Sequence, residues 1–418
     1  MNNILKGFTA SFAAAAVCLV FSLSLMTACA PKDANRPVVC RIDSTGVYCK
    51  YDFRRAMPDD MRISLEVPDG VYLVTVTVGS KKEAGSTTLR GESRRLFAEN
   101  ITTERKEFKT LSFNVHKRTP FISEGESVKI KKREEHKLNW NNTLDLEFTG
   151  SHPTVCTVEI RSNPEVPVVF LCGNSTVVDQ DNEPWASWGQ MIPRFFDETV
   201  CFANFAESGE AANTFIGARR LKKILTMIKP GDYVFVEFGH NDQKQKGEGK
   251  GAYFSFWDSM KTFVDEARAH GATPVLLTPT QRRSFDETGH IQDTHLDFPQ
   301  ATRVLAAETD AYLIDLHQKT RTLYEALGVE PSKKAFVHYP SGTWPGQTKE
   351  LADNTHFNPY GAYEVAKCVI EGMKEAGLPL VSALRNDYTA FDPAHPDDLA
   401  AFVWTPSTFV EIEKPDGN

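Results

Sequence analysis

The sequence predicts two successive parts: an all-β module followed by a domain with a parallel α/β sheet. Short alternating apolar runs separated by turn residues occupy residues 36–163, where long helical periodicity is absent. From residue 166 onward, strand-like apolar runs alternate with stretches of helical spacing. The first pattern is typical of antiparallel sheets, and the second is typical of βα units. A chain of 418 residues is also long for a single core.

In the first part, residues 71–78 and 144–148 show strand alternation, and Asp69-Gly70, Gly79-Ser80 and Gly125 supply turns. In the second part, the expected strands are 168–172, 233–238, 273–277 and 312–316, and the expected helices are 213–228, 254–270 and one with Val365, Cys368, Val369 and Met373 on one face. Residues 385–418 do not repeat this unit, and we expect them to pack back on the body of the protein.

Composition indicates an ordinary globular protein and excludes one class of partner. Hydrophobic residues make up 41% of the chain and charged residues 24%. The formal net charge of -8 argues against a nucleic-acid partner, which needs a basic face. The segment 129–137 (KIKKREEHK) is strongly basic. A solvated hairpin is the simpler interpretation of it, and a surface that meets an acidic polysaccharide is the alternative.

Residues 1–29 are predicted to be an export signal of the lipoprotein type. An apolar stretch, residues 8–26, ends just before Thr-Ala-Cys. Small residues before a cysteine resemble the bacterial lipobox, so Cys29 is the expected lipidation site. Cleavage after Ala30 also fits the small-x-small rule, although Pro31 would then follow the cut. We expect an exported protein whose contact with the membrane is a lipid on Cys29, in the bacterial periplasm or at the cell surface.

The remaining cysteines do not indicate a metal site. Cys40 and Cys49 flank the turn signal at residues 44–46, so a disulfide closing this hairpin and a free pair both stay open. Cysteines at four other positions lie in apolar contexts and are predicted to be buried thiols: Cys156, Cys172, Cys201 and Cys368. None has the C-x-x-C spacing of a zinc site. We expect neither a metal nor a cofactor.

A serine and an Asp-His pair carry the main chemical signal. Ser175 follows the predicted strand 168–172, where ligands of parallel sheets bind. Asp353 and His356 stand three positions apart, just before Asn358-Pro359 opens a helix. A serine hydroxyl becomes a nucleophile when an imidazole takes its proton, and a carboxylate fixes and stabilises that imidazole. Taken alone, Ser175 also fits a helix cap and the Asp-His pair a surface contact.

Four short blocks occur in order along the second part: Gly173-Asn174-Ser175-Thr176-Val177, Asn204 to Gly209, Gly239-His240-Asn241-Asp242, and Asp353-Asn354-Thr355-His356. Together they resemble the SGNH (GDSL-type) hydrolases over roughly residues 166–380. The resemblance implies a flavodoxin-like three-layer α/β/α domain over residues 166–384. One departure is Asn174, where the family usually has aspartate. The α/β-hydrolase alternative is disfavoured because its G-x-S-x-G element is missing.

The resemblance also implies the role of each site residue. Ser175 would be the nucleophile, His356 the general base and then acid, and Asp353 the group that orients His356. The oxyanion hole would consist of the backbone N–H groups of Ser175 and Gly209 and the side-chain amide of Asn241. Such donors stabilise the negative charge that acyl transfer builds on the carbonyl oxygen.

Within the family, the closest resemblance is to rhamnogalacturonan acetylesterases, on the second and third blocks and on Trp188-Gly189-Gln190. It implies an acetylesterase acting on an acetylated plant polysaccharide or oligosaccharide, and we expect a monomer. Trp185 and Trp188 would stack on sugar rings or lie in the core. Arg282 and Arg283 would hold a galacturonate carboxylate or serve the surface. A lipase or thioesterase on the same fold, and a non-catalytic glycan-binding lipoprotein, are the alternatives.

Overall fold

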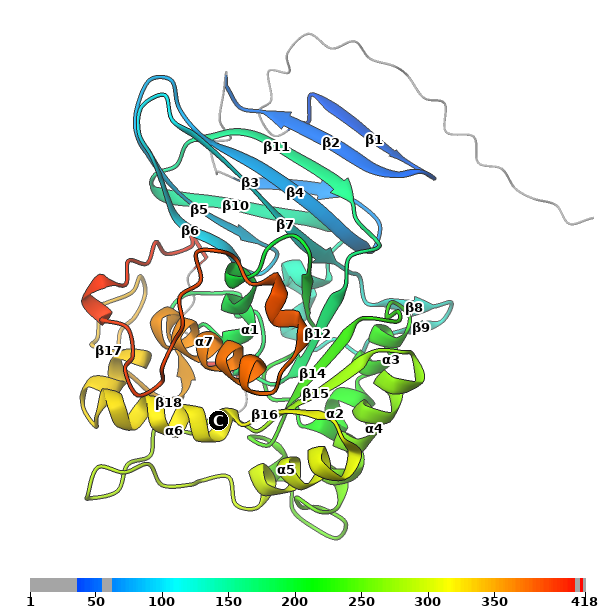
Figure 1. Cartoon of the computed structure of the whole chain (residues 1–418), viewed down its shortest axis with the longest axis vertical. Helices are drawn as coiled ribbons and strands as arrows, with labels where there is room; N and C mark the ends of the chain where they lie inside the picture. Colours follow the sequence, from blue (N-terminus) through cyan, green and yellow to red (C-terminus); the bar gives the residue numbers. More distant parts are fainter. Residues whose placement is uncertain (1–35, 55–61, 410–413, 416–418) are drawn as a thin grey trace, which may run out of the picture.

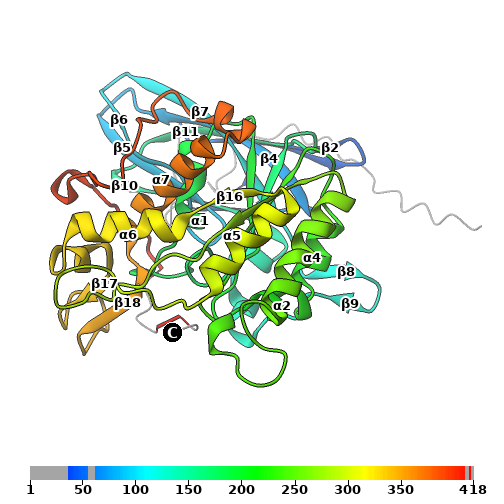
Figure 2. The same ribbon diagram turned by 60° about the horizontal axis from the view of Figure 1, so that its bottom comes forward.

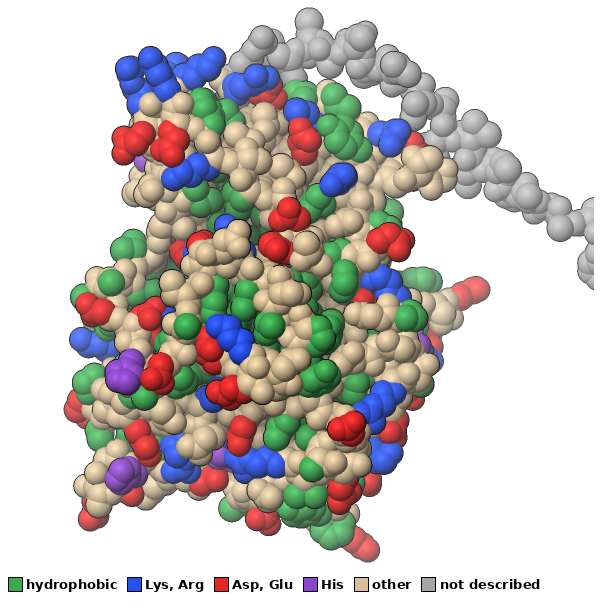
Figure 3. Space-filling view, viewed as in Figure 1, with side chains coloured by type: hydrophobic (Ala, Val, Ile, Leu, Met, Phe, Trp, Pro, Cys, Tyr) green, Lys and Arg blue, Asp and Glu red, His purple; other side chains and the backbone are tan. Residues whose placement is uncertain are grey.

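The computed structural model describes residues 36–54, 62–409 and 414–415, so the expected export signal and Cys29 lie outside the described residues. An antiparallel β part comes first in the chain and an α/β part follows it. The two parts pack against each other (Figure 1). Across the described ranges, every helix is too short or too polar to cross a membrane. Lys, Arg, Asp and Glu side chains are interspersed on the face seen in Figure 3.

The β part consists of two antiparallel sheets around a shared apolar core. The strand order of the first sheet is β1 (Val39–Asp43), β2 (Gly46–Asp52), β11 (Val155–Ser162), β4 (Gly70–Gly79), β7 (Phe108–Lys117). The strand order of the second sheet is β3 (Arg62–Glu66), β10 (Thr143–His152), β5 (Gly85–Gly91), β6 (Arg95–Thr103). Valine and threonine alternate along the second half of β4. Because successive side chains of a strand point to opposite faces, Val74, Val76 and Val78 all point inward. Leu144 and Leu146 of β10 meet them from the second sheet.

A disulfide joins the first two strands. Cys40 and Cys49 stand directly opposite each other in the β1–β2 ladder and are bonded. Of the other described cysteines, Cys172, Cys201 and Cys368 are buried thiols, as expected. Cys156 is only half-buried, because it lies near the start of β11, where its thiol faces the carbonyl of Gly79.

The basic segment does not form the solvated hairpin that we expected. Residues 132–140 form two 3₁₀ helices, η1 (Lys132–His136) and η2 (Leu138–Trp140), next to a small hairpin of β8 (Phe121–Ser123) and β9 (Glu126–Ser127). The Glu134 side chain is fully buried, pairs with Arg220 at 2.5 Å and accepts a hydrogen bond from Trp140 Nε1 at 3.0 Å. Because Arg220 belongs to the α/β part, this contact holds the segment against that part.

The α/β part is built on a parallel sheet of the order β13 (Cys201–Asn204), β12 (Val168–Gly173), β14 (Tyr233–Glu237), β15 (Thr273–Leu277), β16 (Tyr312–Ile314). The second strand in the chain lies outside the first, and the others follow in sequence, which is the flavodoxin-like order. Beside this sheet, β17 (Phe336–Tyr339) and β18 (Leu351–Phe357) form an antiparallel pair.

Helices cover both faces of the parallel sheet (Figures 1 and 2). One face carries α1 (Trp188–Met191), α6 (Leu316–Leu327) and α7 (Pro359–Glu375), and the other carries α2 (Ala212–Gly217), α3 (Arg220–Leu225), α4 (Ser255–Ala269) and α5 (Phe298–Thr309). Val169 and Leu171 of β12 face the first layer, whereas Val168 and Phe170 face the second. The uninterrupted apolar run of this strand therefore reflects burial on both sides.

Short 3₁₀ helices complete the fold: η3 (Ile192–Phe195), η4 (Asp242–Lys244), η5 (Pro331–Ala335), η6 (Pro379–Ala383) and η7 (Leu399–Ala401). Two sequence expectations were too long. The helix expected at 213–228 divides into α2 and α3 at Arg219, whose φ of 65° is left-handed. The strand expected at 312–316 ends at Ile314, because Asp315 caps α6 by accepting a hydrogen bond from the Gln318 N–H.

Buried arginines join the two parts. Arg95, at the start of β6, donates to the Asp179 carboxylate at 2.7 and 3.1 Å, and both side chains are fully buried. Its neighbour Arg94 pairs with Glu183 at 2.6 Å. Asp179 and Glu183 lie on the chain that follows β12, so charges of the β part are neutralised by the α/β part.

The C-terminal segment lies across this junction. Trp404 Nε1 donates to Glu183 at 3.1 Å, and Ser407 Oγ donates to Glu147 of β10 at 2.8 Å. The segment therefore contacts a carboxylate from each part of the chain.

The Arg95–Asp179 pair predicts a large loss of stability on truncation. Arg95→Ala leaves a buried carboxylate without its cation, so the free energy of unfolding should fall by about 3–5 kcal/mol. Denaturant titration followed by circular dichroism measures this change. Arg105→Ala, in an exposed turn, is the control and should stay within roughly 0.5 kcal/mol of the parent. Equal unfolding midpoints for the two variants would contradict this interpretation of the junction.

Candidate active site

Three neighbouring strands bring the first three blocks to one edge of the sheet. β12 lies between β13 and β14, and all three are parallel. Ser175 follows β12, Gly209 follows β13 and Asn241 follows β14. Since the carboxyl ends of parallel strands meet at one edge, these residues converge there. The Glu207 N–H also donates to the Gly173 carbonyl at 3.2 Å, which ties the second block to the first.

The fourth block reaches the same edge from β18. His356 Nε2 lies 2.8 Å from Ser175 Oγ, and His356 Nδ1 lies 2.7 Å from Asp353 Oδ2. All three side chains are buried. Asp353 and His356 both lie on the short strand β18. The helix that follows begins as predicted, because Asn358 caps α7 through a hydrogen bond from the Gly361 N–H.

Asn174 keeps the turn that holds Ser175. Its side-chain oxygen accepts a hydrogen bond from the Thr176 N–H at 3.0 Å and lies 3.0 Å from the Thr176 hydroxyl. Its carbonyl accepts from the N–H groups of Val177 and Val178. These contacts use oxygen atoms, which an aspartate would also provide. The amide at position 174 is therefore compatible with the same turn.

Asp353 is held in its charged form. Burial alone would raise the pKa of this carboxyl, but hydrogen bonds from the His356 ring and from the backbone N–H groups of His356 and Thr355 hold the pKa well below its ordinary value. Lys414 adds an ion pair, with Nζ at 3.3 Å from Asp353 Oδ2. A permanently ionised carboxylate favours a proton on His356 Nδ1, which leaves Nε2 to accept the proton of Ser175.

The expected oxyanion donors follow three neighbouring strands of the sheet. No acceptor for the N–H of Ser175 or Gly209 is found among the residues that the structure describes. Gly209 has φ of 80°, a conformation that side chains rarely adopt. Asn241 Nδ2 donates to the Glu210 carbonyl at 3.0 Å, and its Oδ1 accepts from Lys244 at 3.1 Å. Because an amide carries two N–H bonds, the contact with Glu210 orients Asn241 and leaves a second donor.

Glu237, the last residue of β14, is a buried carboxylate that contacts the residue after Ser175. Its carboxylate accepts hydrogen bonds from Trp188 Nε1 at 2.6 Å, Thr176 Oγ1 at 3.1 Å and the Thr280 N–H at 3.2 Å. Burial raises the pKa of Glu237 to about 7, although the three hydrogen bonds favour the charged form. Glu237 was not among the predicted site residues; its position at the end of a strand, two residues before the third block, was the available signal.

Gln180 links Ser175 to the β part. Its side-chain amide donates to the Ser175 carbonyl at 2.9 Å. Its own carbonyl accepts from Arg94 Nη1 at 3.1 Å and from Gln190 Nε2 at 2.9 Å. No local pattern marks Gln180 in the sequence, because its role depends on an arginine from a distant strand.

The two tryptophans differ in role. Trp188 is 1% exposed and bonded to Glu237, so the expectation that it stacks on sugar is wrong and its core alternative holds. Trp185 is also buried, at 3% exposure, but its ring contacts the His356 ring edge to face at a centroid distance of 5.8 Å. It also lines the cavity described below. Trp185 therefore stays a candidate for substrate contact.

The two arginines, for which a carboxylate site and a surface role were both left open, make hydrogen bonds inside the domain. Arg283 donates to Ser332 Oγ at 3.0 Å and to Asn354 Oδ1 at 3.1 Å, and its N–H bonds to the Asn354 carbonyl at 2.8 Å. It therefore supports the strand that carries Asp353 and His356. Arg282 is half-buried and donates to Thr294 Oγ1 at 3.0 Å and to the His240 carbonyl at 3.3 Å.

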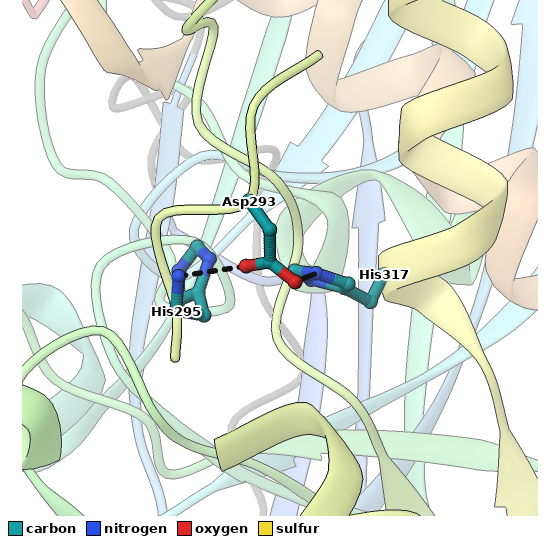
Figure 4. Close-up of side chains that lie close together, drawn as sticks. All are labelled: Asp293, His295 and His317. Atoms are coloured by element: carbon teal, nitrogen blue, oxygen red, sulfur yellow. Dashed lines mark hydrogen bonds and ion pairs between the residues drawn. The ribbon is translucent and has the colours of Figure 1, made fainter. Parts of the chain in front are cut away.

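A cluster of three titratable side chains, drawn in Figure 4, lies next to Arg282. Asp293 lies between His295 and His317, with its Oδ2 3.1 Å from His317 Nε2. The ligand atoms of this trio lie within 4.8 Å of one another. Arg282 Nη1 lies 3.3 Å from His295 Nε2, so the guanidinium group already supplies a positive charge where a metal ion would bind. We interpret the cluster as support for the third block, since the His295 ring packs on His240 at 4.5 Å.

A cavity of about 850 Å³ borders the Ser175–His356 pair. Residues from three segments line it: Ser93, Lys131, Lys132, Arg133, His136, Lys137 and Leu138 from the β part; Gln180, Asp181, Asn182, Trp185 and Ser208 from the α/β part; and Phe409, Lys414 and Pro415 from the C-terminal segment. Trp185 contacts His356, and Gln180 bonds to Ser175, so the cavity lies beside the catalytic candidates.

The parallel sheet and the site at its carboxyl edge define a hydrolase of the SGNH fold. The GDSL-like lipase/acylhydrolase family matches residues 171–362 of this chain. Rhamnogalacturonan acetylesterase RhgT of Bacillus subtilis (strain 168) is 45% identical over 214 residues, which is 51% of this chain and 91% of RhgT. The chain belongs to this family and is a carboxylic-ester hydrolase.

Two further proteins are similar. Probable rhamnogalacturonan acetylesterase YesY of Bacillus subtilis (strain 168) is 34% identical over 219 residues, which is 52% of this chain and 96% of YesY. The crystal structure of YxiM from Bacillus subtilis is 24% identical, with a TM-score of 0.47, and the likeness covers 76% of this chain and 80% of that one.

The raised pKa of Glu237 predicts a pH-dependent stability. The folded state holds this proton more tightly than the unfolded chain, so the contribution of Glu237 is full below its ordinary pKa of 4.5 and is lost as pH rises through about 7. Relative to the parent, Glu237→Gln should gain about 3 kcal/mol between pH 4.5 and pH 8. Denaturant titrations across this range measure the difference. Glu248→Gln, at an exposed position, is the control and should show no such trend.

Proposed function

We propose that this protein is a carbohydrate O-acetylesterase that removes acetyl groups from acetylated rhamnogalacturonan, a pectic polysaccharide. The single observation that carries the proposal is the continuous hydrogen-bonded chain Ser175–His356–Asp353 at the carboxyl edge of the sheet. The substrate class comes from RhgT and YesY, whose names identify them as a rhamnogalacturonan acetylesterase and a probable one. The match with each spans more than nine-tenths of that relative's length.

In the first half of the reaction, Ser175 Oγ attacks the carbonyl carbon of the acetyl ester. His356 Nε2, at 2.8 Å, takes the serine proton, and Asp353 stabilises the positive imidazole. The carbonyl oxygen becomes negative and receives hydrogen bonds from the N–H groups of Ser175 and Gly209 and from the Asn241 amide. Loss of one such donor typically costs about 3 kcal/mol of transition-state stabilisation.

To complete this half, the oxyanion collapses, the bond between the acetyl carbon and the sugar oxygen breaks, and His356 gives its proton to that oxygen, so the sugar leaves as an alcohol. The acetyl group is then bonded to Ser175 Oγ. In the second half, a water molecule gives a proton to His356 Nε2 and attacks the acetyl carbon, and the same donors hold the second oxyanion. Acetate leaves and Ser175 regains its proton, so the enzyme returns to its starting state without a cofactor.

The proposal extends to the location of the protein. A pectic polymer does not enter a cell intact, so an enzyme that acts on the polymer would meet it outside the cytoplasm. The lipobox-like sequence that ends at Cys29 supports export with a lipid anchor in the bacterial periplasm or at the cell surface.

Replacement of the nucleophile should abolish acetate release. Ser175→Ala removes the only atom that can carry the acetyl group in this mechanism, so kcat should fall by roughly 10⁵-fold or more. Acetate released from acetylated rhamnogalacturonan measures the loss, and circular dichroism verifies the fold. Ser123→Ala, on the exposed strand β8, is the control and should keep full activity. Undiminished release by Ser175→Ala would refute the mechanism.

The lining of the cavity predicts a preference for short acyl groups. Most of the described residues that line it are polar or charged, among them lysines, Arg133, Gln180 and Asp181, so a long acyl chain would have to lie against polar groups. The kcat/KM for p-nitrophenyl acetate should exceed that for p-nitrophenyl octanoate by roughly tenfold or more. Spectrophotometric rates, corrected with Ser175→Ala, measure this ratio. A preference for the octanoyl ester would instead support the lipase or thioesterase alternative.

A further inference from the structure

The segment Lys131–Leu138, which we call the basic wall, belongs to the β part but lines the cavity beside the active site. Six of its residues contribute to the lining: Lys131, Lys132, Arg133, His136, Lys137 and Leu138. The segment lies outside residues 171–362, which match the hydrolase family. Its position is therefore a feature that this chain adds to the family domain.

Buried contacts fix the basic wall in place. Glu134 points away from the cavity into the α/β part, where it pairs with Arg220 at 2.5 Å. A buried ion pair of this kind is costly to break, because either partner alone would be an isolated buried charge. Residues on both sides of Glu134 are consequently held at the cavity, so the wall is preorganised.

Three cations of the wall also bind the loop around Gly209. Lys131 pairs with Glu210 at 2.9 Å, and Arg133 pairs with Glu207 at 2.8 Å. Lys137 pairs with Glu207 at 3.0 Å and with Asp181 at 2.9 Å, and its side chain is 10% exposed. These residues are partly neutralised and hold the loop, so substitutions there would change the active site itself.

The cavity nevertheless keeps an excess of positive charge. Lys131, Lys132, Arg133, Lys137 and Lys414 line it, against Asp181 as the one carboxylate among the described lining residues. Glu207 and Glu210 lie behind the wall and are buried. Lys132 is exposed, and no partner for its ammonium group is found in the described part of the chain. Lys132 is thus the cation of the wall that is available to a ligand.

A second observation points to a ligand in the cavity. Trp185 lines the same cavity and is 3% exposed, yet its indole N–H has no hydrogen-bond partner among the described residues. A buried donor without a partner is rare in native proteins. Because Trp185 also contacts His356, this donor lies between the basic wall and the catalytic candidates.

We propose that the basic wall binds the carboxylates of uronic acid residues in the polysaccharide, and that Lys132 makes this enzyme prefer acidic to neutral acetylated glycans. The proposal rests on the proposed esterase function for its substrate and adds the recognition site. Ammonium groups in a concave, partly desolvated site attract carboxylates more strongly than those on an open surface. Binding energy from sugar units beyond the reacting ester would lower KM and leave kcat unchanged.

Charge variants at one exposed position test the proposal. We would compare the parent with Lys132→Gln and Lys132→Glu, using acetylated rhamnogalacturonan, acetylated xylan and p-nitrophenyl acetate. Lys129→Glu is the matched control, since Lys129 is exposed, lies three residues earlier in the same basic run and does not line the cavity. Isothermal titration calorimetry with unacetylated oligogalacturonate measures binding independently of turnover.

We expect a graded response. KM for acetylated rhamnogalacturonan should rise about twofold in Lys132→Gln and roughly fivefold in Lys132→Glu, with kcat unchanged. Rates on acetylated xylan and p-nitrophenyl acetate should not change. The Kd for oligogalacturonate should rise in the same order, and added NaCl should reduce this difference. The Lys129→Glu control should behave like the parent.

Two results would overturn the basic wall as a binding site. One is oligogalacturonate binding that Lys132→Glu leaves unchanged, and the other is equal weakening by Lys129→Glu, which would show a general charge effect. Failure of the proposed function would look different: the parent would hydrolyse p-nitrophenyl acetate but release no acetate from any glycan. The calorimetric comparison would still decide the role of Lys132 in that case.

Discussion

The buried ion pairs of Arg94 and Arg95 are the constraint on which the rest of the structure depends. A buried guanidinium without a carboxylate would cost several kcal/mol, so β6 and the chain after β12 must stay together. That chain also carries Gln180, which accepts from Arg94 and donates to the Ser175 carbonyl. The position of the nucleophile therefore depends on the β part, even though the catalytic candidates all lie in the α/β part.

Polar groups near Ser175 are fixed before any substrate arrives. Asp353 receives two backbone N–H bonds besides the His356 ring, and Glu237 receives three donors from separate elements. Asn241 is oriented by the Glu210 carbonyl. Such preorganisation matters because donors that already point at the reacting oxygen need no rearrangement as charge develops. The family domain supplies this machinery, and the β part stabilises one side of it.

The sequence predicted those features that depend on local pattern. Buried strands appear as apolar runs, and Ser175, Gly209 and Asn241 follow such runs at the strand ends; Asp353 and His356 share a short segment. Features that depend on a distant partner were missed or wrong. Trp188 lies in the core because Glu237 accepts its N–H, and Arg283 is internal because Asn354 accepts its donors. Neither partner is near in sequence, so spacing alone could not identify the pair.

The basic segment shows that one buried residue can determine where the charged side chains around it point. By composition, residues 129–137 resemble any solvated surface. Glu134 is the exception, because its carboxylate is buried against Arg220 and turns the neighbouring cations toward the cavity. Lys131 and Arg133 then both donate to the Ser208 carbonyl, next to Gly209. The same segment thus holds the loop that carries Gly209, the proposed oxyanion donor, and presents charge to the cavity. The proposed recognition of an acidic polymer and the proposed oxyanion hole therefore depend on one segment.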